Sequence, residues 1–137
     1  MHHNRSIPNV TVIPQLPYPD VDKAAQWLCE AFGFTVRLRI GNHRVQLNVG
    51  DGAMVVMEPR DESRKIERGY PLVRVEDARG HCERARRFGA RIIREPADQP
   101  FGERQYTAED LAGHQWTFSQ SIADVDPREW GGEPAQL

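Results

Sequence analysis

Apolar and polar positions recur with two periods along this chain, and their order predicts its secondary structure. The β-branched run at residues 10–16 predicts a strand that stops at Pro17. Apolar residues at helical spacing between Asp20 and Gly33 predict a helix, with Asp20 as its N-cap and Gly33 after its last turn. Apolar and polar residues then alternate in three predicted strands, at 34–40, 43–49 and 53–58.

The same order of elements returns in the second half of the chain. Asp77 matches Asp20 as a helix cap, and the letters RFGA after the second helix match the AFGF that ends the first. The elements predicted there are a strand at 70–75, a helix at 78–88, and strands at 90–96, 104–110 and 114–120. Each half is thus expected to be a β-α-β-β-β module.

These modules predict one α+β domain, because a single half would leave one face of its sheet exposed. The predicted boundaries are a first module at 1–58, a charged linker at 59–69, a second module at 70–120 and a tail at 121–137. The expected architecture is a curved system of eight strands that encloses a cleft, with the helices outside. The modules can pair within one chain or swap across a dimer.

Composition narrows the classes of function. The chain has 137 residues, 39% of them hydrophobic, and a formal charge of -2. A nucleic-acid-binding domain would carry a basic surplus, and a membrane span would need a long apolar run; neither is present in the sequence. No signal peptide is visible, which favours the cytoplasm. Cys29 and Cys82 each fall within a predicted helix and are expected to be reduced structural thiols.

Paired modules, the helix ending D-x-x-x-A-x-x-W-L-x-x-A-F-G-F and the stretch FGERQYTAEDLAGHQWTF together resemble the vicinal oxygen chelate superfamily. The superfamily includes glyoxalase I, extradiol dioxygenases, and the fosfomycin- and bleomycin-resistance proteins. The resemblance spans residues 8–120. It implies the fold, and it implies function only through the residues of the site.

Metal-dependent members of that family take one ligand from the first and one from the last strand of each module. By this resemblance, the four positions fall at Ile13, at Val56 or Met57, at Tyr70 and at Thr117. Such side chains do not hold a divalent ion. We therefore expect no metal or other cofactor. The alternative is a divalent metal that recruits the nearby oxygen ligands Gln15 and Glu58.

Strand alternation and the expected loop give most of the candidate ligand-binding residues, and the resemblance adds Tyr70. Polar rows on the second and third strands, residues near a loop expected at the cleft mouth, and the last strand supply this set: Arg37, Arg39, Gln46, Asn48, Tyr70, Phe101, Arg104, Tyr106 and Thr117. The bland alternatives are a solvated outer face for the polar rows and a packed loop corner for the aromatic residues. Alternation also sets His114, Trp116 and Phe118 on the face under the helices. His114 is therefore expected to be a residue of the turn and the strand entry, outside the cleft.

The sequence favours a metal-free protein that binds a small-molecule ligand, as the bleomycin-resistance branch sequesters its ligand, and that forms a homodimer. The alternative is a metal-dependent lyase, isomerase or dioxygenase of the same superfamily. A third hypothesis is an interaction module whose cleft is filled by Tyr70, Phe101 and Trp116. No nucleic-acid or membrane partner is expected.

Overall fold

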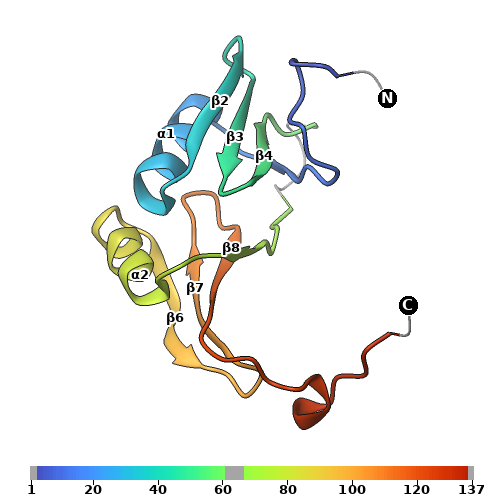
Figure 1. Ribbon diagram of the computed structural model, residues 1–137. Helices are drawn as coiled ribbons and strands as arrows, with labels where there is room; N and C mark the ends of the chain where they lie inside the picture. Colours follow the sequence, from blue (N-terminus) through green and yellow to red (C-terminus); the bar gives the residue numbers. More distant parts are fainter. Residues whose placement is uncertain (1–2, 61–66, 136–137) are drawn as a thin grey trace. The chain divides into compact units, whose positions relative to one another are not determined.

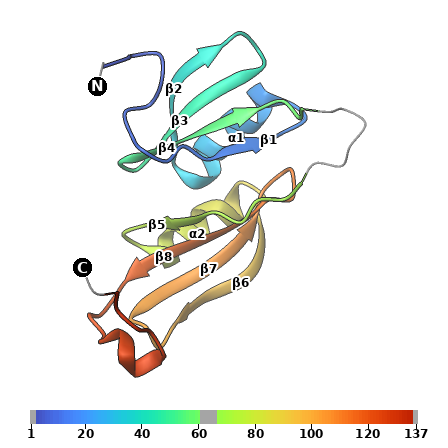
Figure 2. The ribbon, with the colours of Figure 1, turned by 90° about the vertical axis from the view of Figure 1, so that its right-hand side faces the viewer.

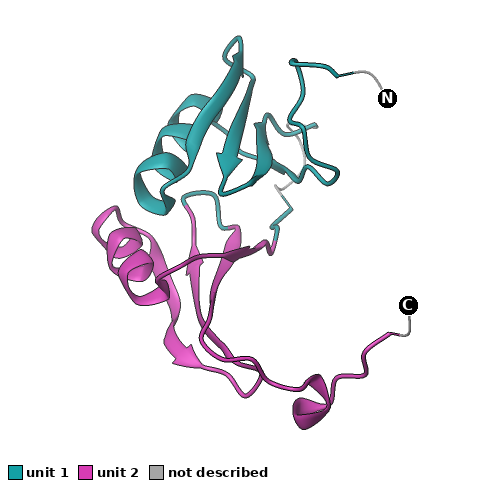
Figure 3. Ribbon diagram, in the orientation of Figure 1, with its two compact units in different colours: residues 1–69, 111–113 teal, residues 70–110, 114–137 magenta. Residues whose placement is uncertain are grey.

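A computed structural model describes residues 3–60 and 67–135 of the chain (Figure 1). The chain forms two compact units, which are shown in different colours in Figure 3. Unit 1 contains residues 1–69 and 111–113, and unit 2 contains residues 70–110 and 114–137. Residues 61–66 of the predicted linker lie outside the described residues. No helix of the described ranges is long and apolar enough to cross a bilayer.

Unit 1 is a mixed four-stranded sheet with one helix packed on it. Its elements are β1 (Gln15–Pro17), α1 (Val21–Phe32), β2 (Thr35–Ile40), β3 (Arg44–Val49) and β4 (Gly52–Met57). The strand order is β1-β4-β3-β2, and β1 runs parallel to β4 while the other neighbours are antiparallel.

The first strand is shorter than the sequence predicted, since it begins at Gln15 and not at residue 10. Pro14 and Pro17 have no N–H to donate, so this segment offers few ladder hydrogen bonds. This segment pairs with β4 through a carbonyl oxygen instead, because the amide N–H of Val55 donates to Pro14 O at 2.9 Å. The predicted strand therefore shrinks to three residues.

Helix α1 forms as its cap and its periodicity predict. The Asp20 carboxylate accepts a hydrogen bond from the amide of Lys23, which satisfies one of the unpaired donors of the first turn. The apolar stripe of α1 is buried against the sheet; its members are Val21, Ala24, Ala25, Leu28, Ala31 and Phe32.

Unit 2 repeats this design. Its elements are β5 (Leu72–Arg74), α2 (Ala78–Arg87), β6 (Arg91–Asp98), β7 (Glu103–Glu109) and β8 (Gln115–Ser121). The strand order β5-β8-β7-β6 is equivalent to that of unit 1, again with one parallel pair. Figure 2 shows α2 on one face of this sheet. A 3-10 helix, η1 (Pro127–Trp130), follows in the predicted tail.

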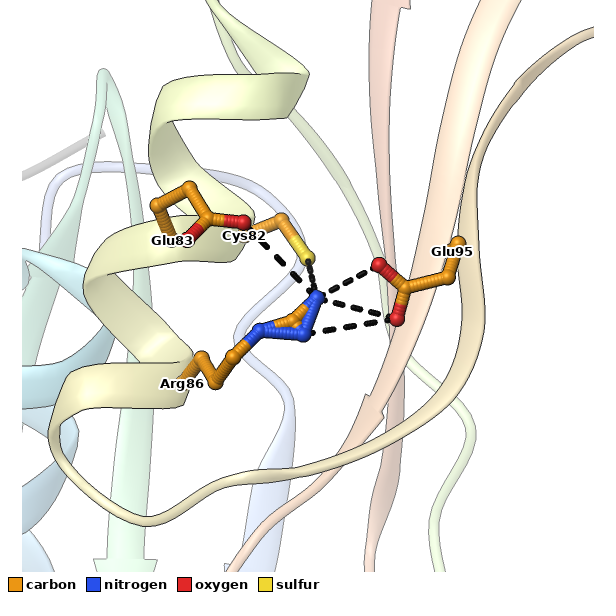
Figure 4. Close-up of polar contacts among 4 residues, drawn as sticks. All are labelled: Cys82, Glu83, Arg86 and Glu95. Atoms are coloured by element: carbon orange, nitrogen blue, oxygen red, sulfur yellow. Dashed lines mark hydrogen bonds and ion pairs between the residues drawn. The ribbon is translucent and has the colours of Figure 1, made fainter.

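Helix α2 is joined to the strand that follows it by an ion-pair cluster. The Arg86 guanidinium contacts the carboxylates of Glu83 on the same helix and Glu95 on β6 (Figure 4). It also donates to the sulfur of Cys82 at 3.7 Å. Burial raises the pKa of the Cys82 thiol, and neither Cys82 nor Cys29 forms a disulfide. The expectation of structural thiols agrees with this environment.

Within the described residues, eight strands therefore form two four-stranded mixed sheets, each with a helix on one face. This is the α+β fold with two β-α-β-β-β modules that the sequence predicted.

Candidate functional site

Each sheet has one face under its helix and one face opposite, and the two faces differ in chemistry. In unit 2 the side toward α2 is aromatic: Phe118 lies 4.2 Å from the His81 ring of α2, and Trp116 stacks beside Phe118 at 6.1 Å between ring centroids. Both are buried, as the alternation of the last strand predicted. The opposite face, called here the helix-free face, carries the polar residues of the same strands.

The helix-free face of unit 2 is a ladder of polar pairs across β7 and β8. Four successive cross-strand pairs lie there: Glu103 with Ser121, Gln105 with Ser119, Thr107 with Thr117, and Glu109 with Gln115. The Ser119 hydroxyl connects two of these pairs, since it donates to Glu103 at 2.7 Å and accepts from the Gln105 amide at 3.0 Å. Ser119 is only 5% exposed. These contacts fix the side chains of Glu103, Gln105 and Ser119 relative to one another.

Thr117 stands in the middle of this ladder. Its hydroxyl lies 3.0 Å from the hydroxyl of Thr107, and both side chains are half-buried. Thr117 is thus on the helix-free face, which is the orientation the sequence predicted. A pair of hydroxyls can donate and accept hydrogen bonds in either direction, so it can adapt to a polar ligand.

Glu103 adds a fixed negative charge at the end of the ladder. Hydrogen bonds from Ser121 and Ser119 lower the pKa of its carboxyl, and the charge of Arg74 on β5 acts in the same direction. The side chain therefore stays ionised at neutral pH. Sequence reasoning missed Glu103, Gln105 and Thr107. Alternation through GERQYTAE, where Tyr106 and Ala108 share the buried face, was the signal that could have found them.

The helix-free face of unit 1 brings three of the predicted residues together. Arg37 donates to the side-chain oxygen of Gln46 at 2.6 Å. Asn48 lies on the same strand face as Gln46 and donates to the hydroxyl of Thr35 at 3.1 Å. Main-chain carbonyls of the N-terminal segment also accept hydrogen bonds from Arg37 and Gln46.

Arg39 does not share this face with Arg37, although strict alternation predicted that it would. A register irregularity between Val36 and Leu38 inserts an extra residue into β2, so the alternation of side chains shifts by one. Arg39 then pairs with Val45 and forms an ion pair at 3.1 Å with Asp22 of α1. It lies on the helix side of the sheet.

Arg104 and Tyr106 also lie on the helix side, and not at a cleft mouth as the sequence suggested. Tyr106 is fully buried, stacks on Phe118 at 5.2 Å and shares a hydrogen bond with His81 of α2. Burial raises the pKa of its hydroxyl far above the usual value. Arg104 binds the Asp98 carboxylate at 2.7 Å. The cause is register: Tyr106 pairs with Phe118, so both must point to the same face.

The two remaining aromatic candidates lie at opposite ends of unit 2. Phe101 belongs to the turn between β6 and β7, where its ring packs 5.3 Å from Trp130 of η1. This arrangement is the packed loop corner that was the alternative prediction for the aromatic residues. Tyr70 precedes β5 and is 73% exposed. Within the described residues, no side-chain hydrogen bond joins Phe101 or Tyr70 to the polar ladder.

His114 is part of a closed turn. Its amide donates to the Asp110 carboxylate at 3.0 Å, and its carbonyl accepts from the amide of Asp110 at 2.9 Å. The same carboxylate accepts from the indole N–H of Trp116 at 3.0 Å, and Gly113 adopts a φ of 90° that favours glycine. His114 is completely buried. The residue serves the turn and the strand entry, as the sequence predicted.

The positions that carry metal ligands in metal-dependent relatives hold poor donors here. Of the two positions predicted on β4, Met57 lies on the helix-free face, whereas Val56 pairs with the buried Val45 on the helix side. The hydroxyl groups at the expected positions are those of Thr117 and of the exposed Tyr70. Among residues 3–60 and 67–135, no group of three or more His, Cys, Asp or Glu could hold a metal ion. The donor set at these positions does not fit a divalent ion.

Comparison with known proteins agrees with this architecture. TioX from Micromonospora sp. ML1 is 31% identical, with a TM-score of 0.74, and the match covers 83% of this chain and 100% of TioX. A glyoxalase/bleomycin resistance protein from Streptomyces sp. CB03234 is 21% identical with a TM-score of 0.66, covering 79% of this chain and 97% of its own. Lactoylglutathione lyase from Agrobacterium tumefaciens is 16% identical with a TM-score of 0.67, covering 82% and 94%. The latter two show the fold alone.

A search of curated proteins found no match. The sequence profile of the Glyoxalase/Bleomycin resistance protein/Dioxygenase superfamily matches residues 7–118, most of the chain. The chain belongs to the Glyoxalase/Bleomycin resistance protein/Dioxygenase superfamily.

Proposed function

We propose that this protein binds a small molecule without a catalytic metal, using the helix-free faces of its sheets. The observation that carries the proposal is the polar ladder of β7 and β8. By the resemblance, Thr117 in this ladder stands at a position where metal-dependent relatives carry a ligand. The role resembles that of the bleomycin-resistance branch, which sequesters its ligand without chemistry.

The chemistry of the ladder favours recognition over turnover. Its hydroxyl and amide groups donate and accept hydrogen bonds, so they can orient a polar ligand. Its carboxylate Glu103 has a lowered pKa, which makes it a poor proton donor at neutral pH. An ionised carboxylate at this position favours a cationic or hydrogen-bond-donating group on the ligand.

A metal-dependent lyase, isomerase or dioxygenase finds less support. The side-chain oxygen of Gln15, one of the two fallback ligands, accepts a hydrogen bond from the guanidinium of Arg44. A divalent cation at this oxygen would face a positive charge within hydrogen-bond distance. Glu58, the other fallback ligand, follows the end of β4 and is exposed.

The proposal is tested by metal content and by ligand binding on the same preparation. The protein is purified without chelators, its metals are quantified by mass spectrometry, and thermal shifts are recorded with bleomycin, a glutathione S-conjugate and catechol as probes. We expect less than stoichiometric Zn, Ni, Mn or Fe, and a raised midpoint with one probe, because a ligand that binds only the native state stabilises it. Stoichiometric metal, or conversion of a bound probe to product, would overturn the proposal.

Two matched variants locate the site. Thr117→Val removes the central hydroxyl of the ladder with little change in volume, and we expect it to weaken probe binding about ten-fold, the effect of one lost hydrogen bond. Thr11→Val makes the same change at an exposed position of the N-terminal segment and should leave binding unchanged. Equal affinity of both variants would remove the ladder from the site.

The ligand site between the two modules, the homodimer and the cytoplasmic location stay predictions that accompany this proposal. Size-exclusion chromatography with light scattering tests the dimer directly: a monomer at micromolar concentration contradicts it.

A further inference from the structure

The chain's own N-terminal segment occupies part of the helix-free face of unit 1. Residues 4–8, named here the N-terminal strap, lie across Arg37 and Gln46. The Arg37 guanidinium donates to the carbonyls of Arg5 and Ile7 at 3.1 and 3.2 Å. The Gln46 amide donates to the carbonyl between them, Ser6 O, at 2.9 Å.

The strap is held mainly by these carbonyl contacts. It belongs to no helix or strand, and the side chains of Arg5, Ser6 and Ile7 are exposed, with Ile7 at 51%. Only Pro8 is buried. A segment with so little packing can leave its site without opening the core of unit 1.

The two residues beneath the strap are arranged in advance for binding oxygen. Arg37 also donates to Gln46 Oε1 at 2.6 Å, which uses the acceptor of Gln46 and turns its N–H donors outward. Gln46 is only 4% exposed, so its amide must be paired. Since a guanidinium has no acceptor, the pair presents donors alone. Any occupant must bring acceptor oxygens.

We propose that Arg37 and Gln46 form a subsite for the amide carbonyl oxygens of a ligand, and that the N-terminal strap fills this subsite in the free protein. The inference rests on the proposed function for the existence of a ligand. A strap that competes for the subsite lowers the apparent affinity for the ligand. The apparent association constant is the intrinsic constant multiplied by the fraction of molecules in which the strap is released.

Proteolysis of the full chain tests whether the strap is held by this pair. Trypsin cleaves after Arg5, and the carbonyl it must attack is the one that Arg37 binds. Gln46→Glu replaces the donor to Ser6 O with an acceptor, and we expect removal of residues 1–5, followed by mass spectrometry, to become about ten-fold faster, as for one lost hydrogen bond. Gln26→Glu makes the same change on the exposed side of α1 and should leave the rate unchanged. Equal rates in both variants would overturn the proposal.

A peptide probe tests whether the vacated pair binds carbonyls. The probe is the acetylated peptide amide of residues 4–8, titrated against a variant that lacks residues 1–7 but keeps every helix and strand. We expect the backbone amide resonances of positions 37 and 46, which also exist in Gln46→Glu, to shift at millimolar peptide in the shortened variant. At least about ten-fold more peptide should be needed in the full chain, where the tethered strap competes. Absence of a shift in the shortened variant would sink the proposal.

Neither arm uses the probes of the proposed function, so the two failures are distinguishable. Trypsin protection and peptide binding that both depend on Gln46 support the subsite even if no small-molecule probe binds. Conversely, a small-molecule probe that binds while Gln46→Glu changes neither trypsin cleavage nor peptide binding leaves the proposed function standing and overturns the subsite.

Discussion

Replacing Asp110 with alanine should destabilise the protein more than any surface substitution. The Asp110 side chain is 6% exposed and accepts two hydrogen bonds, from the amide of His114 and the indole N–H of Trp116, both at 3.0 Å. Alanine removes both acceptors. Because His114 and Trp116 are buried, water cannot easily replace the lost partner.

The expected size of the effect follows from these two contacts. A hydrogen bond to a charged group contributes about 1.5–3 kcal/mol, and two bonds that share one carboxylate are not additive. We expect a loss of about 3–4 kcal/mol in the free energy of unfolding, out of the roughly 5–15 kcal/mol that a domain possesses. For a chain of this length the midpoint of thermal unfolding should fall on the order of 10–20 °C. Asp110→Asn keeps one acceptor oxygen and should lose about half as much.

Urea unfolding followed by circular dichroism measures the difference, and Asp124→Ala is the control, because that aspartate is exposed. The control should change the free energy of unfolding by less than about 0.5 kcal/mol. A loss below about 1 kcal/mol for Asp110→Ala would refute the reasoning, since it would mean that the turn is held together without the carboxylate.

Three further predictions test other parts of the structure. Glu103→Gln should make the stability of the protein less dependent on pH in the acid range. Because the pKa of Glu103 is lowered, the folded state binds fewer protons than the unfolded chain. The resulting stability is present above the usual Glu pKa and is lost as pH falls through the lowered pKa. The measurement is the midpoint of thermal unfolding at each pH, expressed relative to the midpoint at neutral pH. The same change for variant and wild type between about pH 5 and 3 would contradict this prediction. In Gly102→Ala the new residue would have to adopt a φ of 84°, and its Cβ would lie 2.4 Å from Ala123 O. We expect the free energy of unfolding, measured with urea, to fall by about 2–4 kcal/mol. Gly50→Ala, at a φ of 57° with nothing within 4 Å, should cost only about 1 kcal/mol, and equal losses would refute the clash. Tyr106→Phe should lose about 1–2 kcal/mol by removing its hydrogen bond to α2, and an unchanged urea midpoint would show that this bond adds nothing.

Local signals in the sequence predicted the helices and strands and the orientation of Thr117 in the candidate site. Asp20 and Asp77 cap the two helices as the sequence indicates, because a cap needs only its own side chain and an amide three residues on. Alternation orients Thr117 correctly because β8 is regular over its whole length. Of the candidates predicted on the paired strands of unit 2, Thr117 lies on the helix-free face, whereas Arg104 and Tyr106 lie on the helix side.

The candidates that sequence reasoning misplaced on the strands, Arg39, Arg104 and Tyr106, depend on contacts with other elements of the fold. Alternation puts Arg37 and Arg39 on one face, but the irregularity in β2 separates them, and it exists only where β2 meets β3. Alternation also groups Arg104 with Tyr106, but it cannot tell which face a helix will cover. The contact of Tyr106 with His81 decides this.

The sequence by itself determined the order of strands and helices in each module and the two helix caps, since each depends on residues close together in the chain. Tertiary structure decided that the irregularity in β2 separates Arg39 from Arg37, and it decided which side chains meet on the helix-free faces. It also decided that residues 4–8 return to cover Arg37 and Gln46. These outcomes depend on hydrogen bonds between distant segments, and a pattern with a period of two residues carries no information about them.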